Sequence, residues 1–213
     1  MVTARINATT LLLAVGAIVV VELLQAALQT ATPLPALAAT GINRLLQTAL
    51  LLGIVFQVRR ELAPIGLSWA TLAAGIKRGL MWSSAFGIVA ATGFAGYYLL
   101  GGHPLALIRS RLPDRTGDLV LLFVVGGLIA PVAEEIFFRG ILYGFLRRWG
   151  AVTAVAISTV VFVILHPAPG LSLTQIVGGV VFATAYEIEG NLMVPILIHV
   201  LGNNAIFALS LTY

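Results

Sequence analysis

The sequence predicts an all-α protein, a transmembrane bundle of about seven helices. Of its 213 residues, 60% are apolar and only 9% are charged, whereas soluble domains are about half apolar and about a quarter charged. Apolar stretches also recur along the whole chain. Each is close to the ~20 residues that a helix rising about 1.5 Å per residue needs to cross ~30 Å of hydrocarbon.

The apolar stretches are separated by one longer amphipathic segment. The predicted spans are residues 9–28, 35–58, 80–101, 118–147, 151–166, 172–187 and 191–211. We expect residues 59–79 to lie along the membrane interface, because Pro64, Gly66 and several charges interrupt them and Trp69 suits the head-group level. This divides the chain into N-terminal transmembrane helices, residues 1–117, and a four-helix core, residues 118–211.

Charge and composition exclude several classes of function. The chain contains no cysteine, so disulfides, thiolate metal ligands and a cysteine nucleophile are absent. Its net charge of +4 comes from scattered residues, which favours anchoring at the lipid bilayer over binding of nucleic acid. We expect a multi-pass protein of the cell membrane, that of a prokaryote; the sequence leaves its oligomeric state open.

The fourth predicted span contains three charges in the stretch "EEIFFR". A charge at bilayer depth costs at least ~2.5–3.5 kcal/mol, so such groups normally face the protein interior and mark function. Glu135 and Arg139 are four residues apart with the acid first, which favours an ion pair. Glu134 points about 100° away around the helix and is the candidate base. Pro131 removes one backbone hydrogen bond and leaves a free carbonyl beside this site.

Two later spans add polar groups that face the bundle. His166 ends the fifth span, with Phe162 one turn earlier, and His199 and Asn203 share a face of the last span. His103 lies in a loop and receives no role. One carboxylate, two imidazoles and one carboxamide suit amide hydrolysis, which needs a base, a group that orients water and donors for the oxyanion.

These residues form the ordered pattern EExxxR, FxxxH and HxxxN, read here as "EEIFFR", "FVILH" and "HVLGN". The pattern resembles the CPBP (CAAX protease and bacteriocin-processing, or Abi) intramembrane proteases, which include the type II CAAX prenyl endopeptidases. The resemblance covers residues 118–211. It implies an intramembrane endopeptidase acting on a peptide or membrane-protein substrate, of CAAX type or in bacteriocin and self-immunity processing.

The resemblance also implies a role for each motif residue. Glu134 would be the general base, His166 would help to hold the water, and His199 with Asn203 would stabilise the oxyanion. The supporting residues would be Glu135, Arg139 and Phe162. Aspartyl and HExxH protease plans lack their motifs in this chain.

A cofactor is the first open alternative. We expect none, but Zn²⁺ is compatible with the residues, since one glutamate and two histidines can ligate zinc and leave a position for water. The ligands would then be Glu134, His166 and His199.

A non-catalytic reading is the second alternative, in which the protein is a membrane scaffold or immunity partner that retains the fold. Glu134, Glu135 and Arg139 would then be a structural triad, and His199 and Asn203 would join helices by hydrogen bonds. Two further groups receive no catalytic role. We expect Glu187 and Glu189 to lie in a solvated turn, and polar residues of the first two spans to pair across helices: Glu22, Gln25, Asn43, Arg44 and Gln47.

Overall fold

The protein is a helical bundle in a computed structural model that describes residues 6–166 and 173–212. Its α-helices are α1 (Ala8–Ala31), α2 (Ala36–Arg59), α3 (Leu72–Leu99), α4 (Thr116–Val124), α5 (Ala130–Glu135), α6 (Gly144–Leu146), α7 (Ala151–Ile164), α8 (Leu173–Glu189) and α9 (Met193–Ser210). Two π-helical segments, η4 (Val125–Ile129) and η5 (Ile136–Tyr143), join α4, α5 and α6 into one long helix. The part of the chain that is described contains no strand, and the all-α prediction is confirmed.

Within the described residues, five helical stretches are long and apolar enough to cross a membrane. They are Ala8–Ala31, Ala36–Arg59, Ala63–Leu99, Thr116–Trp149 and Met193–Ser210. Each of the seven predicted spans contains a helix of the described residues, with residue 172 lying outside them, but α7 has only 14 residues and α8 only 17, short of the ~20 that a full crossing needs. The chain is therefore a multi-pass membrane protein in which two helices of the core are short.

The start of the third helix was predicted wrongly. It begins at Leu72, not near residue 80, and 3₁₀ turns η1 (Ala63–Ile65) and η2 (Trp69–Thr71) precede it. The early turns of α3 are fixed by close packing that hydropathy does not report. A Cβ at Gly75 would lie 2.4 Å from the side chain of Asn191, and one at Gly79 would lie 2.8 Å from Leu197. Trp69 is 92% exposed, and its place at the head groups stays a prediction.

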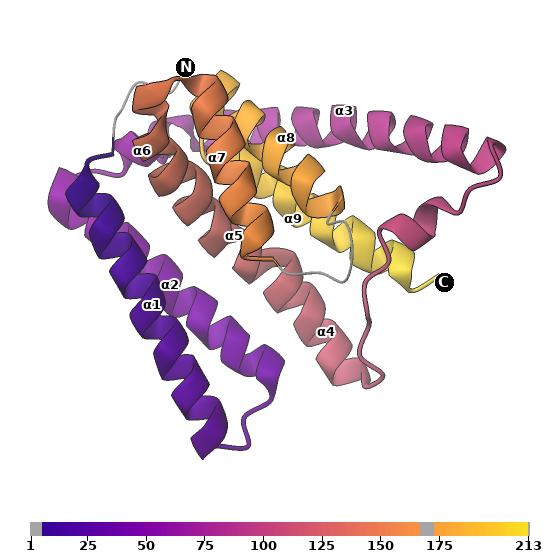
Figure 1. Ribbon diagram of the computed structural model, residues 1–213, viewed down its shortest axis with the longest axis horizontal. Coiled ribbons are helices and arrows are strands. Elements are labelled where there is room, and N and C mark those ends of the chain that lie inside the picture. The colour runs from indigo at the N-terminus through magenta and orange to yellow at the C-terminus, as the bar shows by residue number, and fades with distance from the viewer. Residues whose placement is uncertain (1–5, 167–172, 213) are drawn as a thin grey trace.

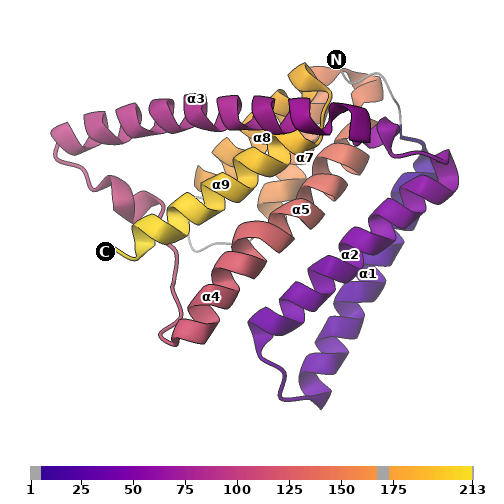
Figure 2. The ribbon, with the colours of Figure 1, turned by 180° about the vertical axis from the view of Figure 1, so that it is seen from behind.

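Figures 1 and 2 show how the helices surround the long α4–α6 helix. The α1–α2 hairpin lies to one side of it and contacts it through α2. On the other side lie α7, α8 and α9, which pack on one another, while α3 crosses α9 and extends beyond the bundle. The long helix is thus the central element, with both halves of the chain packed against it.

Two groups of polar residues outside the motifs pair between helices. In the hairpin, Gln47 donates to Glu22 over 2.9 Å and Asn43 donates to Gln25, which is the pairing expected. The second group is Glu187 and Glu189, for which the prediction of a solvated turn was wrong. Both lie in the last turn of α8 and not in a loop.

Their carboxylates have partners on other helices. Glu187 accepts hydrogen bonds from Tyr143 and, through both oxygens, from Arg147, each over 2.8 Å. Glu189 accepts one from the indole of Trp82 over 2.9 Å. The two glutamates therefore tie α8 to the long helix and to α3.

Candidate active site

The long helix changes its winding shortly before the glutamates. Ala130 donates its N–H to the carbonyl of Val125, five residues back, which is the π pattern. Pro131 has no N–H, so it cannot serve the carbonyl of Gly127 in an α-helix or that of Gly126 in a π-helix. Side chains of α9 supply the missing hydrogen-bond donors.

The donors to these carbonyls are two consecutive asparagines. Asn203 Nδ2 donates to the Gly126 oxygen over 2.9 Å, and Asn204 Nδ2 donates to the Gly127 oxygen over 2.8 Å. A buried backbone carbonyl without a partner is costly, and hydrocarbon offers it no water. The irregular backbone around Pro131 is therefore completed by α9.

Glu135 lies in the centre of a buried, hydrogen-bonded triad. Its Oε1 accepts a hydrogen bond from Arg139 over 2.9 Å and lies 2.7 Å from Nδ1 of His199. Glu135 and Arg139 are wholly buried, and His199 is 5% exposed. Arg139 also donates to the carbonyl of Gly179 over 3.3 Å. The α5 and η5 segments are thus joined to α8 and α9 by one hydrogen-bonded network.

Aromatic rings enclose this triad. The guanidinium carbon of Arg139 lies 4.9 Å from the centre of the Phe162 ring and 5.1 Å from that of Phe182, in the range of a cation–π contact. The imidazole of His199 stacks on Phe182 at 4.6 Å. Phe162 was expected to support the site. Phe182 was not, since an aromatic residue in an apolar helix gives no signal of its own.

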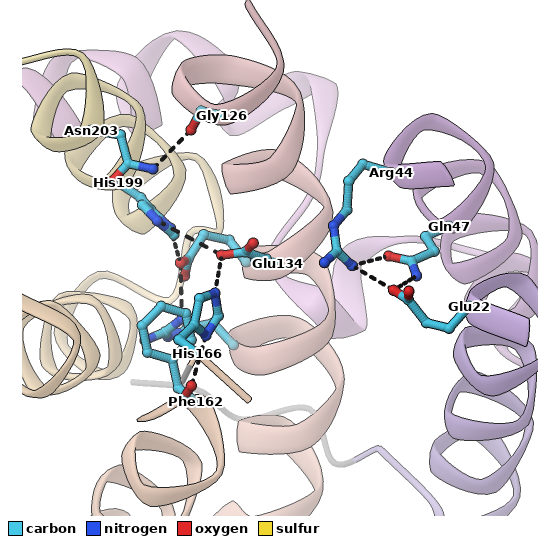
Figure 3. Close-up of polar contacts among 11 residues, drawn as sticks. Glu22, Arg44, Gln47, Gly126, Glu134, Phe162, His166, His199 and Asn203 are labelled. Atoms are coloured by element: carbon cyan, nitrogen blue, oxygen red, sulfur yellow. Dashed lines mark hydrogen bonds and ion pairs between the residues drawn. The ribbon is translucent and has the colours of Figure 1, made fainter. Parts of the chain in front are cut away.

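Glu134 lies between the two imidazoles, as Figure 3 shows. Its Oε2 is 3.4 Å from Nε2 of His166 and 3.8 Å from Nε2 of His199. His166 is fixed from behind, because its Nδ1 lies 2.7 Å from the carbonyl oxygen of Phe162. The acid and the two imidazoles, which come from α5, the end of α7 and α9, do meet at one point.

Asn203 is the predicted residue that the structure places differently. It follows His199 by one turn of α9, but its carboxamide is turned toward Gly126, and the HxxxN motif gives no sign of this (Figure 3). Among the described residues its hydrogen bond goes to that carbonyl, which leaves one N–H of the amide for another acceptor.

The hydrogen bonds decide which ring nitrogens carry protons. A carbonyl and a carboxylate can only accept, so Nδ1 of both His166 and His199 must carry a hydrogen. Both Nε2 atoms then face Glu134, either as a bare lone pair in the neutral ring or as a second donor in the imidazolium.

The donor types of this site suit zinc, whose histidine ligands commonly donate their other N–H to a carboxylate or a backbone carbonyl. The placement does not: in residues 6–166 and 173–212, no group of three histidine, aspartate or glutamate side chains is arranged to hold a metal ion. We therefore derive no step through a metal, and the expectation that none takes part stays a prediction.

A second polar cluster faces the site from the hairpin. Arg44 lies 3.3 Å from Glu22 and donates to Gln47 over 2.6 Å. Figure 3 shows the cluster across the long helix from the histidines. The first two helices thus place a paired arginine on that side of the long helix.

Comparison with known proteins agrees with this geometry. Residues 116–205, which contain all of the motifs, match the family model described as "Type II CAAX prenyl endopeptidase Rce1-like". A protein of Bacillus subtilis (strain 168) named "Putative membrane peptidase YdiL" is 28% identical over 138 residues. That alignment covers 62% of this chain and 57% of the relative's length. No solved structure matches the chain. Residues 116–205 of this chain are thus similar to the type II CAAX prenyl endopeptidase family, and the chain is also similar to a protein named as a membrane peptidase.

Proposed function

We propose that the protein is an intramembrane endopeptidase that hydrolyses a peptide bond with a water molecule activated by Glu134. One observation carries the proposal: the carboxylate of Glu134 lies within 3.4 Å of His166 and 3.8 Å of His199. These residues are 32 or more positions apart in sequence. Polar groups from three helices meet here, although burying each of them away from water costs free energy. Such a costly arrangement inside a membrane protein is typical of a functional site.

The attacking water would be held by two acceptors. With its Nδ1–H bound to the Phe162 carbonyl, neutral His166 offers a bare lone pair at Nε2. A water that donates one hydrogen to this nitrogen and the other to Glu134 keeps its own lone pair free. As its oxygen bonds to the scissile carbonyl carbon, its proton passes to Glu134, the general base.

The oxyanion would be stabilised by His199. Its Nδ1–H points at Glu135, so only an imidazolium can offer a second hydrogen, at Nε2, to the developing negative charge. Glu135 accepts the hydrogen bond from the Nδ1–H of His199, and Arg139 holds Glu135 in place. The free N–H of Asn203 is the second donor, and loss of one such donor typically lowers kcat by about 10²–10³.

The reaction would end by transfer of the same proton. When the C–N bond breaks, Glu134 gives its proton to the leaving nitrogen, so that an amine and a carboxylic acid are released and the carboxylate of Glu134 is restored. Glu134 therefore acts first as a base and then as an acid.

Zinc is the alternative to this mechanism. If the enzyme instead held zinc, Glu134, His166 and His199 would be the candidate ligands, although their placement in the described residues does not form a metal site. Elemental analysis of the purified protein and assays in chelator decide between the two. Stoichiometric zinc together with activity lost in chelator would replace the metal-free mechanism.

The proposed substrate is a peptide segment that reaches the site within the membrane. A prenylated CAAX sequence is the first candidate, because the matching family is described by that substrate class. Bacteriocin leaders and membrane-protein fragments are the next to test, since a helix bundle that buries its site in the bilayer admits hydrophobic chains.

The decisive experiment compares Glu134→Gln with the unchanged protein in lipid nanodiscs. Quenched fluorescent peptides, one of them prenylated at a CAAX end, report cleavage, and mass spectrometry locates the cut. We expect kcat to fall by about 10²–10⁴, because the amide keeps the shape but cannot accept the proton. Glu189→Gln, which alters a contact with Trp82 outside the site, is the matched control and should remain active.

Two results would count against the enzyme. Undiminished cleavage by the Glu134→Gln protein would remove the base from the mechanism. Full function of that variant in cells, with no cleavage by either protein, would instead favour the non-catalytic scaffold.

A further inference from the structure

The proposed chemistry depends on the direction in which the long helix presents Glu134. We infer that Asn204 is a positioning residue: it holds the π-helical turn η4 open and so directs Glu134 toward the two histidines. This inference rests on the proposed function, and Asn204 lies outside the HxxxN motif.

The contacts of Asn204 define a clamp between two helices. Its Nδ2 donates to the Gly127 carbonyl in η4 over 2.8 Å and to the Val200 carbonyl of its own helix over 2.7 Å. Both hydrogens of the amide are therefore used. The second bond fixes the side chain on α9, and the first connects it to the turn that lies seven residues before Glu134.

The turn needs this donor because of Pro131. In a regular helix the N–H four residues later would serve the Gly127 carbonyl, and proline has none. With α winding, the main chain therefore leaves the Gly127 carbonyl without its donor. Asn204 supplies the missing hydrogen to Gly127, as Asn203 does for Gly126.

Glycine at position 127 permits the close approach. A Cβ there would lie 2.6 Å from Oδ1 and 2.7 Å from Nδ2 of Asn204, closer than real side chains come. No other residue can occupy this position while the asparagine keeps its place.

Rotation of the helix connects this clamp to catalysis. An α-helix advances about 100° per residue. A π turn closes its hydrogen bond over five residues instead of four, so it contains one extra residue. The part before the turn is anchored, since Val125 fits against Gly41 of α2, where a Cβ would lie 2.9 Å from its Cγ2. If η4 closed to an α turn, Glu134 would turn by about 100° and leave the histidines.

The test uses Asn204→Leu, which keeps most of the side-chain volume and removes the donor. We expect kcat to fall at least tenfold while KM changes less than threefold, because the reacting carboxylate moves and the rest of the substrate path does not. Asn43→Leu is the matched control: it removes another buried carboxamide that bonds between helices, to Gln25. It should lower thermal stability and leave kcat unchanged.

A second readout does not depend on cleavage. The chain has three histidines, so ring ¹⁵N chemical shifts in labelled protein can be assigned to each. If Glu134 turns away, the shifts of His166 and His199 in Asn204→Leu move toward those in Glu134→Gln, while His103 serves as internal reference. A residue that only stabilises the fold would leave the shifts of the folded protein as they are.

The outcomes separate this inference from the proposed function. Unchanged histidine shifts in folded Asn204→Leu overturn the positioning role, whether or not the protein cleaves peptides. Moved shifts in a protein that cleaves nothing support the positioning role and count against the enzyme. If Asn204→Leu does not fold, Gly127→Ala is judged by the same shifts, since it displaces the asparagine but keeps its amide.

Discussion

At the scale of single residues, the two adjacent glutamates have separate tasks because they point to different sides of the helix. Glu135 is fully buried between Arg139 and His199, whereas Oε2 of Glu134 lies near the Nε2 atoms of His166 and His199. The i,i+4 spacing predicted the pair of Glu135 with Arg139. That Glu135 also holds His199, 64 residues later, could not be predicted from spacing, because it depends on how α9 packs.

Glu135→Gln should separate catalysis from binding. In the proposed mechanism, an imidazolium at His199 would lose its counter-charge without this carboxylate, and we expect kcat to fall by about 10²–10³ with little change in KM. Steady-state kinetics on a cleavable peptide measure both values. An equal rise of KM with kcat unchanged would place Glu135 in substrate binding instead.

At the scale of elements, the sequence predicts helices well and their ends poorly. Hydropathy predicted a helix correctly in each of the seven spans, because a lipid-facing helix must be apolar over its length. Hydropathy misplaced the start of α3, because the first turns of this helix are fixed by packing. Gly75 and Gly79 lie against side chains from the last part of the chain. Hydropathy did not predict π-helical winding at all. Pro131 and the two glycines before it are the signal that was present, since they imply carbonyls that need other donors.

Two glycines of α3 test whether its start is fixed by packing. Gly79→Ala should destabilise the protein by about 1–3 kcal/mol, because the new methyl would lie 2.8 Å from Leu197. A methyl added at Gly87 would have nothing within 4 Å, so Gly87→Ala should be neutral or stabilising by up to about 1 kcal/mol. Thermal unfolding in detergent compares the two. Equal effects would show that α3 does not pack on α9 in this way.

At the scale of the whole molecule, the site is an assembly of distant parts. The motifs supplied Glu134, His166 and His199, which the structure brings together, since each motif places polar groups on the inner face of its own helix. They could not predict the ring of Phe182 on His199 or the bond from Asn203 to Gly126. Those contacts depend on the relative rotation of the helices, which is set by packing across the whole bundle.

The link between the long helix and α8 provides a test at this scale. Arg147 binds both oxygens of Glu187 over 2.8 Å, with side chains 26% and 16% exposed. Arg147→Met should lower stability by about 1–2 kcal/mol, since hydrogen bonds to charged groups contribute more than neutral ones but partial exposure weakens them. Arg59→Met, at an exposed position at the end of α2, should change unfolding little. A similar loss in both variants would assign the effect to net charge.

The buried pair of Glu135 and Arg139 has a consequence for biosynthesis. The residues that enclose it, on α7, α8 and α9, leave the ribosome later than the long helix does. Until those residues cover it, the nascent helix exposes both charges and Glu134, and placing them among acyl chains costs free energy. The helix must therefore stay beside water or a translocation partner until the following 60 or so residues, up to His199, have been made and can fold over it.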